Sequence, residues 1–240
     1  MSGHSHWSTI KHKKEALDKK KGAVFSRMAR LISLAAREGG ADPETNFELR
    51  SAIDKARSVN MPNRNIEKAI EKAAGAEDNR EEWFRVSYEA FGPGQTAMVI
   101  EGITDNKNRT LEGVKGVLSK HGGKLAEPGS VRWLFKHLGR LNIEIPSKEK
   151  EDAELKAIEA GAVETEWDEN FLMAYVLPEK LEEARQSLVK SGLSVSDYSL
   201  EWVAPDNVVV SENDRDKLNK LLEALSDQDD IQEVYFNAEL

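Results

Sequence analysis

The sequence contains no cysteine. This absence excludes disulfides, thiolate nucleophiles and most structural zinc sites, and it is typical of proteins from a reducing compartment. No run of eighteen apolar residues occurs either, so no segment is predicted to cross a bilayer and no membrane partner is expected. The first residues lack both the apolar stretch of a signal peptide and the Arg/Ser-rich character of a transit segment, so we expect a cytoplasmic protein.

Motifs that mark common catalytic sites are also missing. The sequence has no G-x-x-x-x-G-K-[ST] phosphate-binding loop and no G-x-S-x-G nucleophile elbow. Its many carboxylates fall on predicted helix faces or in turns, where exposure to solvent explains them. We therefore expect no catalytic residues, no cofactor and no small-molecule substrate, and we predict that the protein is not an enzyme.

Charge is distributed unevenly along the 240 residues, which carry a net charge of −9. Residues 1–75 contain fifteen Lys/Arg and nine Asp/Glu, a balance of +6, so the other nineteen and thirty-four give −15 for residues 76–240. A basic end on an acidic body is typical of a nucleic-acid-binding segment, since phosphate binding needs only a local concentration of cations.

The densest basic run lies in the first twenty-one residues, where lysines accompany histidines and one tryptophan. Lysines neutralise phosphates, and a tryptophan offers a flat face for stacking on an unpaired base, although Trp7 alone is more simply explained by packing. The spacing of His4, His6 and His12 matches no metal motif, so no metal is predicted. The nucleic-acid-binding candidates in this run are His4, Trp7, Lys11, His12, Lys13, Lys14, Lys19, Lys20 and Lys21.

The rest of the basic segment is predicted to be a small helical bundle. Apolar residues recur at helical spacing over 23–37, and Arg27 and Arg30 fall on the opposite side and join the candidates. A second helix is capped near Pro43 or Asn46, and a third begins at Pro62. Arg64 and Lys68 follow at spacing four on that helix and complete the set.

The periodicity after residue 82 changes to that of a mixed α+β region. Strands are predicted over 86–91, 96–103 and 130–135, with a helix over 109–121. The segment from 140 to 203 reads as strand, helix, hairpin, helix and strand, which is the ferredoxin-like β-α-β-β-α-β order. A helix predicted over 214–225 and a strand predicted over 231–237 then supply the further helix and strand that would complete the 80–137 unit.

The predicted fold class is therefore α+β. A basic N-terminal helical bundle (1–77) precedes two ferredoxin-like α/β domains, of which the third (138–205) is inserted into a discontinuous second (78–137 plus 206–240). A further candidate site is the loop T-D-N-K-N-R-T, with Asp105, Asn106 and Arg109, which joins a strand to a helix. Capping by Asp105 or Asn108 explains the loop structurally, whereas cations at a helix N-terminus would suit an anion.

Several ordered motifs along nearly the whole chain resemble the YebC/PmpR family. They are GHSHW, AAREGGADPETNFELR, N-M-P, Y-E-A-F-G-P-G, TDNKNRT, HGG, GSV and DDIQEVYFN. The resemblance implies a helical domain followed by two α/β domains. It places the family's basic motif on His4, Trp7, Lys11, His12 and Lys14, and its loop motif on Asp105, Asn106 and Arg109. Ala90 and Gln95 stand where relatives commonly have glycine.

What the resemblance implies about function is regulation of gene expression without catalysis. Bacterial members are described as probable transcriptional regulators that bind DNA. Others resemble translation factors that associate with the ribosome and relieve stalling at proline runs, and a mitochondrial relative activates translation of cytochrome c oxidase subunit I.

The residues themselves favour RNA, because lysine dominates the opening and a strongly acidic body would be repelled by a long duplex. We thus expect a ribosome-associated factor that contacts ribosomal RNA. A DNA-binding regulator, and a protein-interaction module that uses the acidic domains, remain as alternatives.

Overall fold

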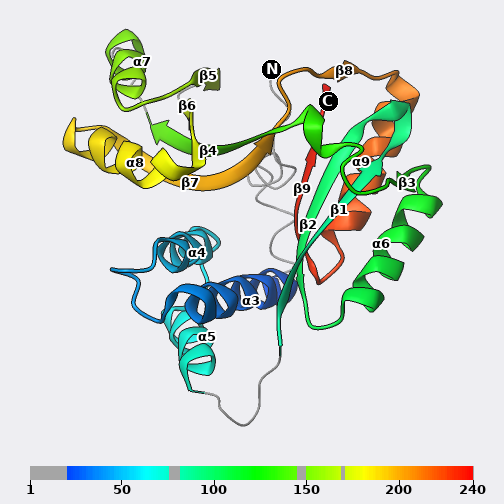
Figure 1. The fold of residues 1–240 in the computed structure, drawn as a ribbon, viewed down its shortest axis with the longest axis horizontal. Coiled ribbons are helices and arrows are strands. Elements are labelled where there is room, and N and C mark those ends of the chain that lie inside the picture. The colour runs from blue at the N-terminus through cyan, green and yellow to red at the C-terminus, as the bar shows by residue number, and fades with distance from the viewer. Residues whose placement is uncertain (1–20, 76–81, 145–149, 169–170, 240) are drawn as a thin grey trace. The chain divides into compact units, whose positions relative to one another are not determined.

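A computed structural model of the chain describes residues 21–75, 82–144, 150–168 and 171–239. The described residues divide into two compact units, one formed by Lys136–Trp202 and the other by the residues up to Phe135 together with those from Val203 onward. Among the described helices, none is long and apolar enough to cross a membrane. Figure 1 shows the elements, whose labels are used below.

The first described stretch, residues 21–75, contains three helices: α3 (Lys21–Gly39), α4 (Phe47–Ser58) and α5 (Asn63–Ala74). They share a small core in which Ile32, Leu49 and Ala56 are completely buried. Of the two caps predicted for α4, the structure has the one at Asn46, whose side chain accepts a hydrogen bond from the Leu49 N–H. Pro62, the predicted first residue of α5, occupies its cap position, so the helix begins one residue later, at Asn63.

The next part of the chain forms a four-stranded sheet of order β3-β1-β2-β9. Its elements are β1 (Phe84–Phe91), β2 (Ala97–Thr104), α6 (Lys107–Lys120), β3 (Lys124–Leu125), α9 (Glu212–Ser226) and β9 (Ile231–Phe236). β9 pairs with β2 although the whole of Lys136–Trp202 separates them in sequence. The last helix and strand therefore return to the first sheet, as the sequence predicts.

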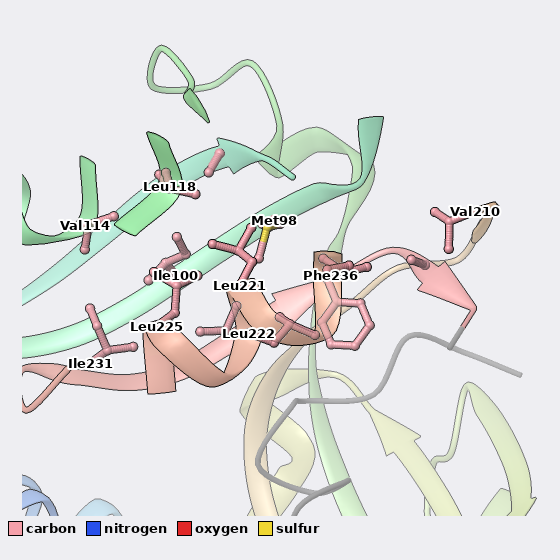
Figure 2. Packing of buried hydrophobic residues seen from close by; sticks show 14 residues of the cluster. Met98, Ile100, Val114, Leu118, Val210, Leu221, Leu222, Leu225, Ile231 and Phe236 are labelled. Carbon is pink, nitrogen blue, oxygen red and sulfur yellow. The ribbon is translucent and has the colours of Figure 1, made fainter. Parts of the chain in front are cut away.

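Helices α6 and α9 cover one face of this sheet (Figure 1). Leu118 of α6 and Leu221 of α9 meet Met98 and Ile100 of β2, and all four side chains are fully buried (Figure 2). Burying each of them stabilises the fold by about 1.5–3 kcal/mol. A short parallel pair, β8 (Val208–Val209) with β10 (Ala238–Glu239), was not predicted.

The unit Lys136–Trp202 contains a second four-stranded sheet, of order β5-β6-β4-β7. Its elements are β4 (Lys136–Glu144), α7 (Lys150–Glu159), β5 (Glu164–Asp168), β6 (Phe171–Val176), α8 (Leu181–Lys190) and β7 (Ser194–Val203). This element order and strand order are those of a ferredoxin-like fold. The predicted α+β class, with helices first and strand-rich sheets after, is confirmed.

One predicted strand is wrong. Residues 130–135 contain a short 3-10 helix, Arg132–Leu134, and no strand. Glu89, a buried residue of β1, accepts hydrogen bonds from the backbone N–H groups of Gly129, Val131 and Arg132. These amides are therefore satisfied by a carboxylate far away in sequence and not by a neighbouring strand.

Candidate nucleic-acid interface

The structure contains a cationic groove between α3 and α5, of about 340 Å³. Four of its lining residues are basic, namely Arg30, Arg37, Lys68 and Lys72, and none of the described residues that line it is acidic. Its remaining walls are small or apolar and include Phe25, Met61 and Trp83. Cations beside aromatic rings suit a ligand that carries both phosphates and flat bases.

The groove exists because both helices place small residues where they face each other. Ala29 and Ser33 of α3 line it opposite Ala69 and Ala73 of α5. The Ser33 hydroxyl donates to the Ala69 carbonyl across the helices, at 2.9 Å, and so ties their backbones together. Longer side chains at these positions would fill the space between the helices.

The structure shows where several of the predicted nucleic-acid-binding residues lie, beginning with Arg64 and Lys68. Both are exposed on α5, and Lys68 lines the groove. Lys21 is exposed at the start of α3. The other candidates of the opening run, His4, Trp7, Lys11, His12, Lys13, Lys14, Lys19 and Lys20, lie outside the described residues.

The positions of Arg27 and Arg30 require a correction. Arg27 is buried, and its guanidinium donates to the Ser226 carbonyl at the end of α9, at 2.6 Å. Arg30 forms an ion pair with Asp230, at 2.8 Å, and its guanidinium lies 5.4 Å from the centre of the Trp83 ring. The side of α3 opposite the bundle core therefore contacts the end of α9 and the turn before β9. We remove Arg27 from the proposed interface because its guanidinium is already bound there.

Asp230 connects three segments and was not singled out from the sequence. It precedes β9 and accepts hydrogen bonds from Arg30, Arg109, Thr104 and Thr110, at 2.8, 2.9, 3.2 and 2.7 Å. Its burial raises the pKa, but hydrogen bonds from Arg109 and Thr110 and the nearby positive charges outweigh this effect. The pKa of the Asp230 carboxyl is therefore lower than its ordinary value.

The loop candidates Asp105, Asn106 and Arg109 belong to this network. Asn106 caps α6 by accepting from the Arg109 N–H, at 3.1 Å, so the predicted caps Asp105 and Asn108 are wrong. The Arg109 guanidinium contacts Asp105 at 2.6 Å and Asp230 at 2.9 Å. These bonds raise the pKa of Arg109 and explain the loop structurally without a ligand.

A second cavity, of about 690 Å³, adjoins this network. Its lining mixes the cations Arg30 and Arg109 with the carboxylates of Asp105, Asp229 and Asp230. This balance of charge makes it a poorer anion site than the groove between α3 and α5. Within the described residues, no cluster of three or more His, Asp or Glu side chains is arranged to hold a metal ion.

The candidates chosen from the sequence leave out the groove residues Arg37, Lys72 and Trp83, although Arg37 falls on the same side of its helix as Arg27 and Arg30. Lys72 follows Arg64 and Lys68 at the same spacing, so the pattern on α5 contained the necessary signal. Trp83 follows the bundle in sequence, and no local pattern relates it to α3. Its position beside Arg30 depends on contacts between separate segments.

These features define an α+β protein whose N-terminal helices carry a groove lined by basic and aromatic side chains. Two protein-family models match the sequence. The one described as the TACO1/YebC protein N-terminal domain covers residues 5–76, and the one described as the TACO1/YebC second and third domain covers residues 83–238. The chain belongs to the TACO1/YebC family, which confirms the resemblance drawn from its motifs.

Relatives of known sequence and structure agree. A probable transcriptional regulatory protein of Kosmotoga olearia is 44% identical over 243 residues, covering 100% of this chain and 95% of the relative. One of the same description from Halothermothrix orenii is 43% identical, covering 100% and 96%. The crystal structure of a conserved hypothetical protein from Aquifex aeolicus matches with a TM-score of 0.87 at 39% identity, covering 98% of this chain and 97% of that one.

Proposed function

We propose that the protein is a non-enzymatic regulator of gene expression that binds RNA through its basic N-terminal helices and acts as a ribosome-associated translation factor. The observation that carries this proposal is the groove between α3 and α5, which has four cations, one of them (Arg30) paired with Asp230, and no carboxylate among its described lining residues. The lysine-rich run of residues 11–21 precedes α3 directly and adds to the positive charge at this end of the chain.

The shape of the groove favours RNA over a DNA duplex. Readout of duplex DNA usually inserts a protruding helix into the major groove, whereas a recess with aromatic walls accepts unpaired bases, which are abundant in RNA loops. The acidic remainder of the chain, at −15 over residues 76–240, also opposes binding along a duplex. Relief of stalling at proline runs is the activity that the family resemblance suggests.

A DNA-binding transcriptional regulator is the second candidate, and two observations favour it. The curated relatives are named probable transcriptional regulatory proteins. In addition, residues 59–62 form a four-residue connection between α4 and α5, and the exposed Asn63, Arg64 and Asn65 begin the second helix. Two helices joined in this way, with Asn and Arg at the second N-terminus, resemble a helix-turn-helix base reader.

Ultraviolet crosslinking in growing cells, followed by sequencing of the joined nucleic acid, separates the two candidates. Ribosomal RNA is expected among the crosslinked reads, and its signal should fall when Lys11, Lys13 and Lys14 are changed to glutamate. Reads that gather at discrete promoter DNA would establish the transcriptional alternative. Reads at background level would favour the remaining alternative, in which the acidic domains bind another protein.

Salt dependence tests the groove itself in vitro. If about five basic residues neutralise phosphates, the logarithm of affinity should fall with the logarithm of salt concentration at a slope of roughly −3.5 to −4.5. Lys68→Glu should weaken binding and reduce that slope by about 1. The matched control is Lys190→Glu, an equal charge change at an exposed lysine of the other unit, which should alter neither quantity. Equal effects of the two substitutions would contradict the proposal that the groove binds RNA.

A further inference from the structure

The most exposed aromatic side chain among the described residues has no role in the site above. Trp133 lies in the 3-10 helix Arg132–Leu134, in the loop that follows β3, and is 74% exposed. Tryptophan buries more apolar area than any other side chain when it packs, so an exposed tryptophan is a common centre of an interaction surface.

The loop that carries Trp133 is held in one conformation by a buried carboxylate. Glu89 accepts from the Gly129 N–H at 2.7 Å, the Val131 N–H at 2.6 Å and the Arg132 N–H at 2.8 Å. Burial raises the pKa of Glu89, but these three hydrogen bonds outweigh it, so the pKa lies below its ordinary value and the group is ionised at neutral pH. A side chain presented on a preorganised loop loses little entropy when it binds.

The indole is also fixed, and its polar edge is already used. The Trp133 Nε1–H donates to the Ser130 carbonyl at 2.9 Å. What the ring offers to a partner is therefore its aromatic face and not a hydrogen-bond donor. A stacking partner with a flat π surface matches this better than a partner that must supply an acceptor.

The stretch of sequence around Trp133 holds more basic than acidic residues, and the Glu89 carboxylate also contacts this loop. Residues 120–135 contain Lys120, Lys124 and Arg132 against the single acid Glu127, a balance of +2, whereas residues 76–240 as a whole sum to −15. Lys124 pairs with Phe91 across β3 and β1, and its ammonium lies 5.6 Å from the centre of the Phe91 ring. The Arg132 guanidinium donates to the Ser87 hydroxyl at 2.7 Å. Lys124, Ser87 and Glu89 share the sheet face opposite α6 and α9.

We propose that the Trp133 loop is a second RNA contact, in which the indole face stacks on an unpaired base while Lys124 and Arg132 face the flanking phosphates. The identity of the partner as RNA rests on the proposed function, but the site itself rests on residues outside the N-terminal helices. An exposed aromatic flanked by cations is the arrangement by which proteins bind single-stranded nucleic acid without sequence preference.

The test uses the full chain and an unstructured, fluorescently labelled oligouridine RNA of about ten nucleotides, a length within the usual span of such sites. Trp133→Leu keeps apolar volume but removes the aromatic face, and it should weaken binding about tenfold. Trp133→Phe keeps a ring and should retain most of the affinity. Because stacking involves no counterion release, the salt slope should stay at its original value in both variants. Leu155→Ala, at a side chain 61% exposed in the other unit, is the matched control.

Each outcome separates this site from the groove. If Trp133→Leu weakens binding and Lys68→Glu does not, the loop is supported and the groove fails. If Lys68→Glu weakens binding and Trp133→Leu has no effect on RNA affinity, the loop proposal is overturned. Equal losses in Trp133→Leu and Trp133→Phe would also overturn it, because stacking requires the ring and not the exact side chain. Unfolding midpoints measured in parallel show that each variant is folded.

Discussion

Gly102 in β2 determines how closely the turn that contains Asp230 approaches the sheet. A Cβ atom at this position would lie 2.5 Å from the Asp230 carbonyl oxygen, a backbone atom that cannot rotate away. The neighbouring Ile103 N–H donates to the same carbonyl at 2.8 Å. Glycine is thus required at residue 102 for close backbone approach, and the position of the Asp230 carboxylate depends on it.

Gly102→Ala should destabilise the protein by about 1–3 kcal/mol, because the added methyl group must push the Asp230 turn away from β2. Gly116→Ala is the control, since Gly116 lies inside α6 and a methyl group added there would meet no other atom within 4 Å. That change should stabilise the helix by about 0.5–1 kcal/mol. Urea unfolding measures both, and a neutral Gly102→Ala would show that the turn relaxes freely.

Glu89 gives a pH dependence of known sign. Its pKa is lowered in the folded protein from an ordinary value of 4.5, so its contribution to stability is fully present above that value and is lost as pH falls toward the folded pKa. Glu89→Gln should therefore cost about 1–3 kcal/mol at pH 7, because a neutral amide cannot replace a carboxylate that accepts three N–H groups. The difference from the original protein should shrink below pH 4.5. A constant difference down to pH 3 would contradict this role.

At the scale of elements, α3 is attached to the rest of its unit by contacts of different strength. The pair Arg30–Asp230 has side chains only 13% and 14% exposed, whereas Arg85 contacts Glu38 and Glu48 through side chains about half exposed. Solvent screens the second set, and exposed pairs of this kind contribute about 0–1 kcal/mol. Among these ion pairs, Arg30–Asp230 therefore contributes most to the anchoring of α3, beside the hydrogen bond from the buried Arg27 to Ser226.

Asp230→Asn should lower the free energy of unfolding by about 2 kcal/mol, because Arg30 would be left largely buried without a charged partner. Arg85→Ala should lower it by less than about 1 kcal/mol. Chemical denaturation of both variants at pH 7 gives the comparison. If Arg85→Ala had the larger effect, the exposed contacts and not Asp230 would hold α3 in place.

Elements with strong local patterns are predictable, and those defined by distant contacts are not. The stripe Leu49, Ala52, Ile53 and Ala56 predicts α4, and its Asn46 cap is visible in the sequence. The 3-10 helix at residues 132–134 resembles a strand in sequence because the acceptor that satisfies its amides is Glu89, more than forty residues earlier in the chain. In the same way, periodicity places Arg27 on a polar face and gives no sign that Ser226 covers it.

The candidate site is predictable to the same degree. The spacing of Arg64 and Lys68 identifies the basic face of α5, but a groove needs two helices and Trp83, so its shape cannot be derived from one segment. Gln95 shows the reverse case, because the family resemblance implies a glycine at this position and the residue has a positive φ of 60°. The motif comparison therefore detects a real backbone constraint.

At the scale of the whole molecule, the larger of the two compact units holds two separate hydrophobic cores, one shared by α3, α4 and α5 and one under the first sheet, and on that basis we propose a division into three domains. The unit Lys136–Trp202 carries its own ferredoxin-like sheet and its own buried ion pairs, in which Arg140 contacts Glu201 and Asp197 at 2.9 Å each. Two carboxylates raise the pKa of this buried guanidinium despite its desolvation.

The segment Lys136–Trp202 should consequently fold when expressed alone, with a single cooperative urea transition and the circular dichroism of a mixed α/β protein. Arg140→Leu in that segment should reduce its stability, because Glu201 would be buried without a positively charged partner. A fragment without a cooperative transition would show that this segment needs the remainder of the chain to fold.

The pairing of β9 with β2 has a consequence for synthesis. Ribosomes produce β2 early, but its partner strand and the Asp230 turn appear only after the whole of Lys136–Trp202 has been made. During that interval the edge of β2 has no neighbour, and unpaired edges invite wrong pairing between chains. At roughly 5–20 residues per second, synthesis of the inserted segment keeps this edge open for several seconds, whatever the rate at which that segment folds.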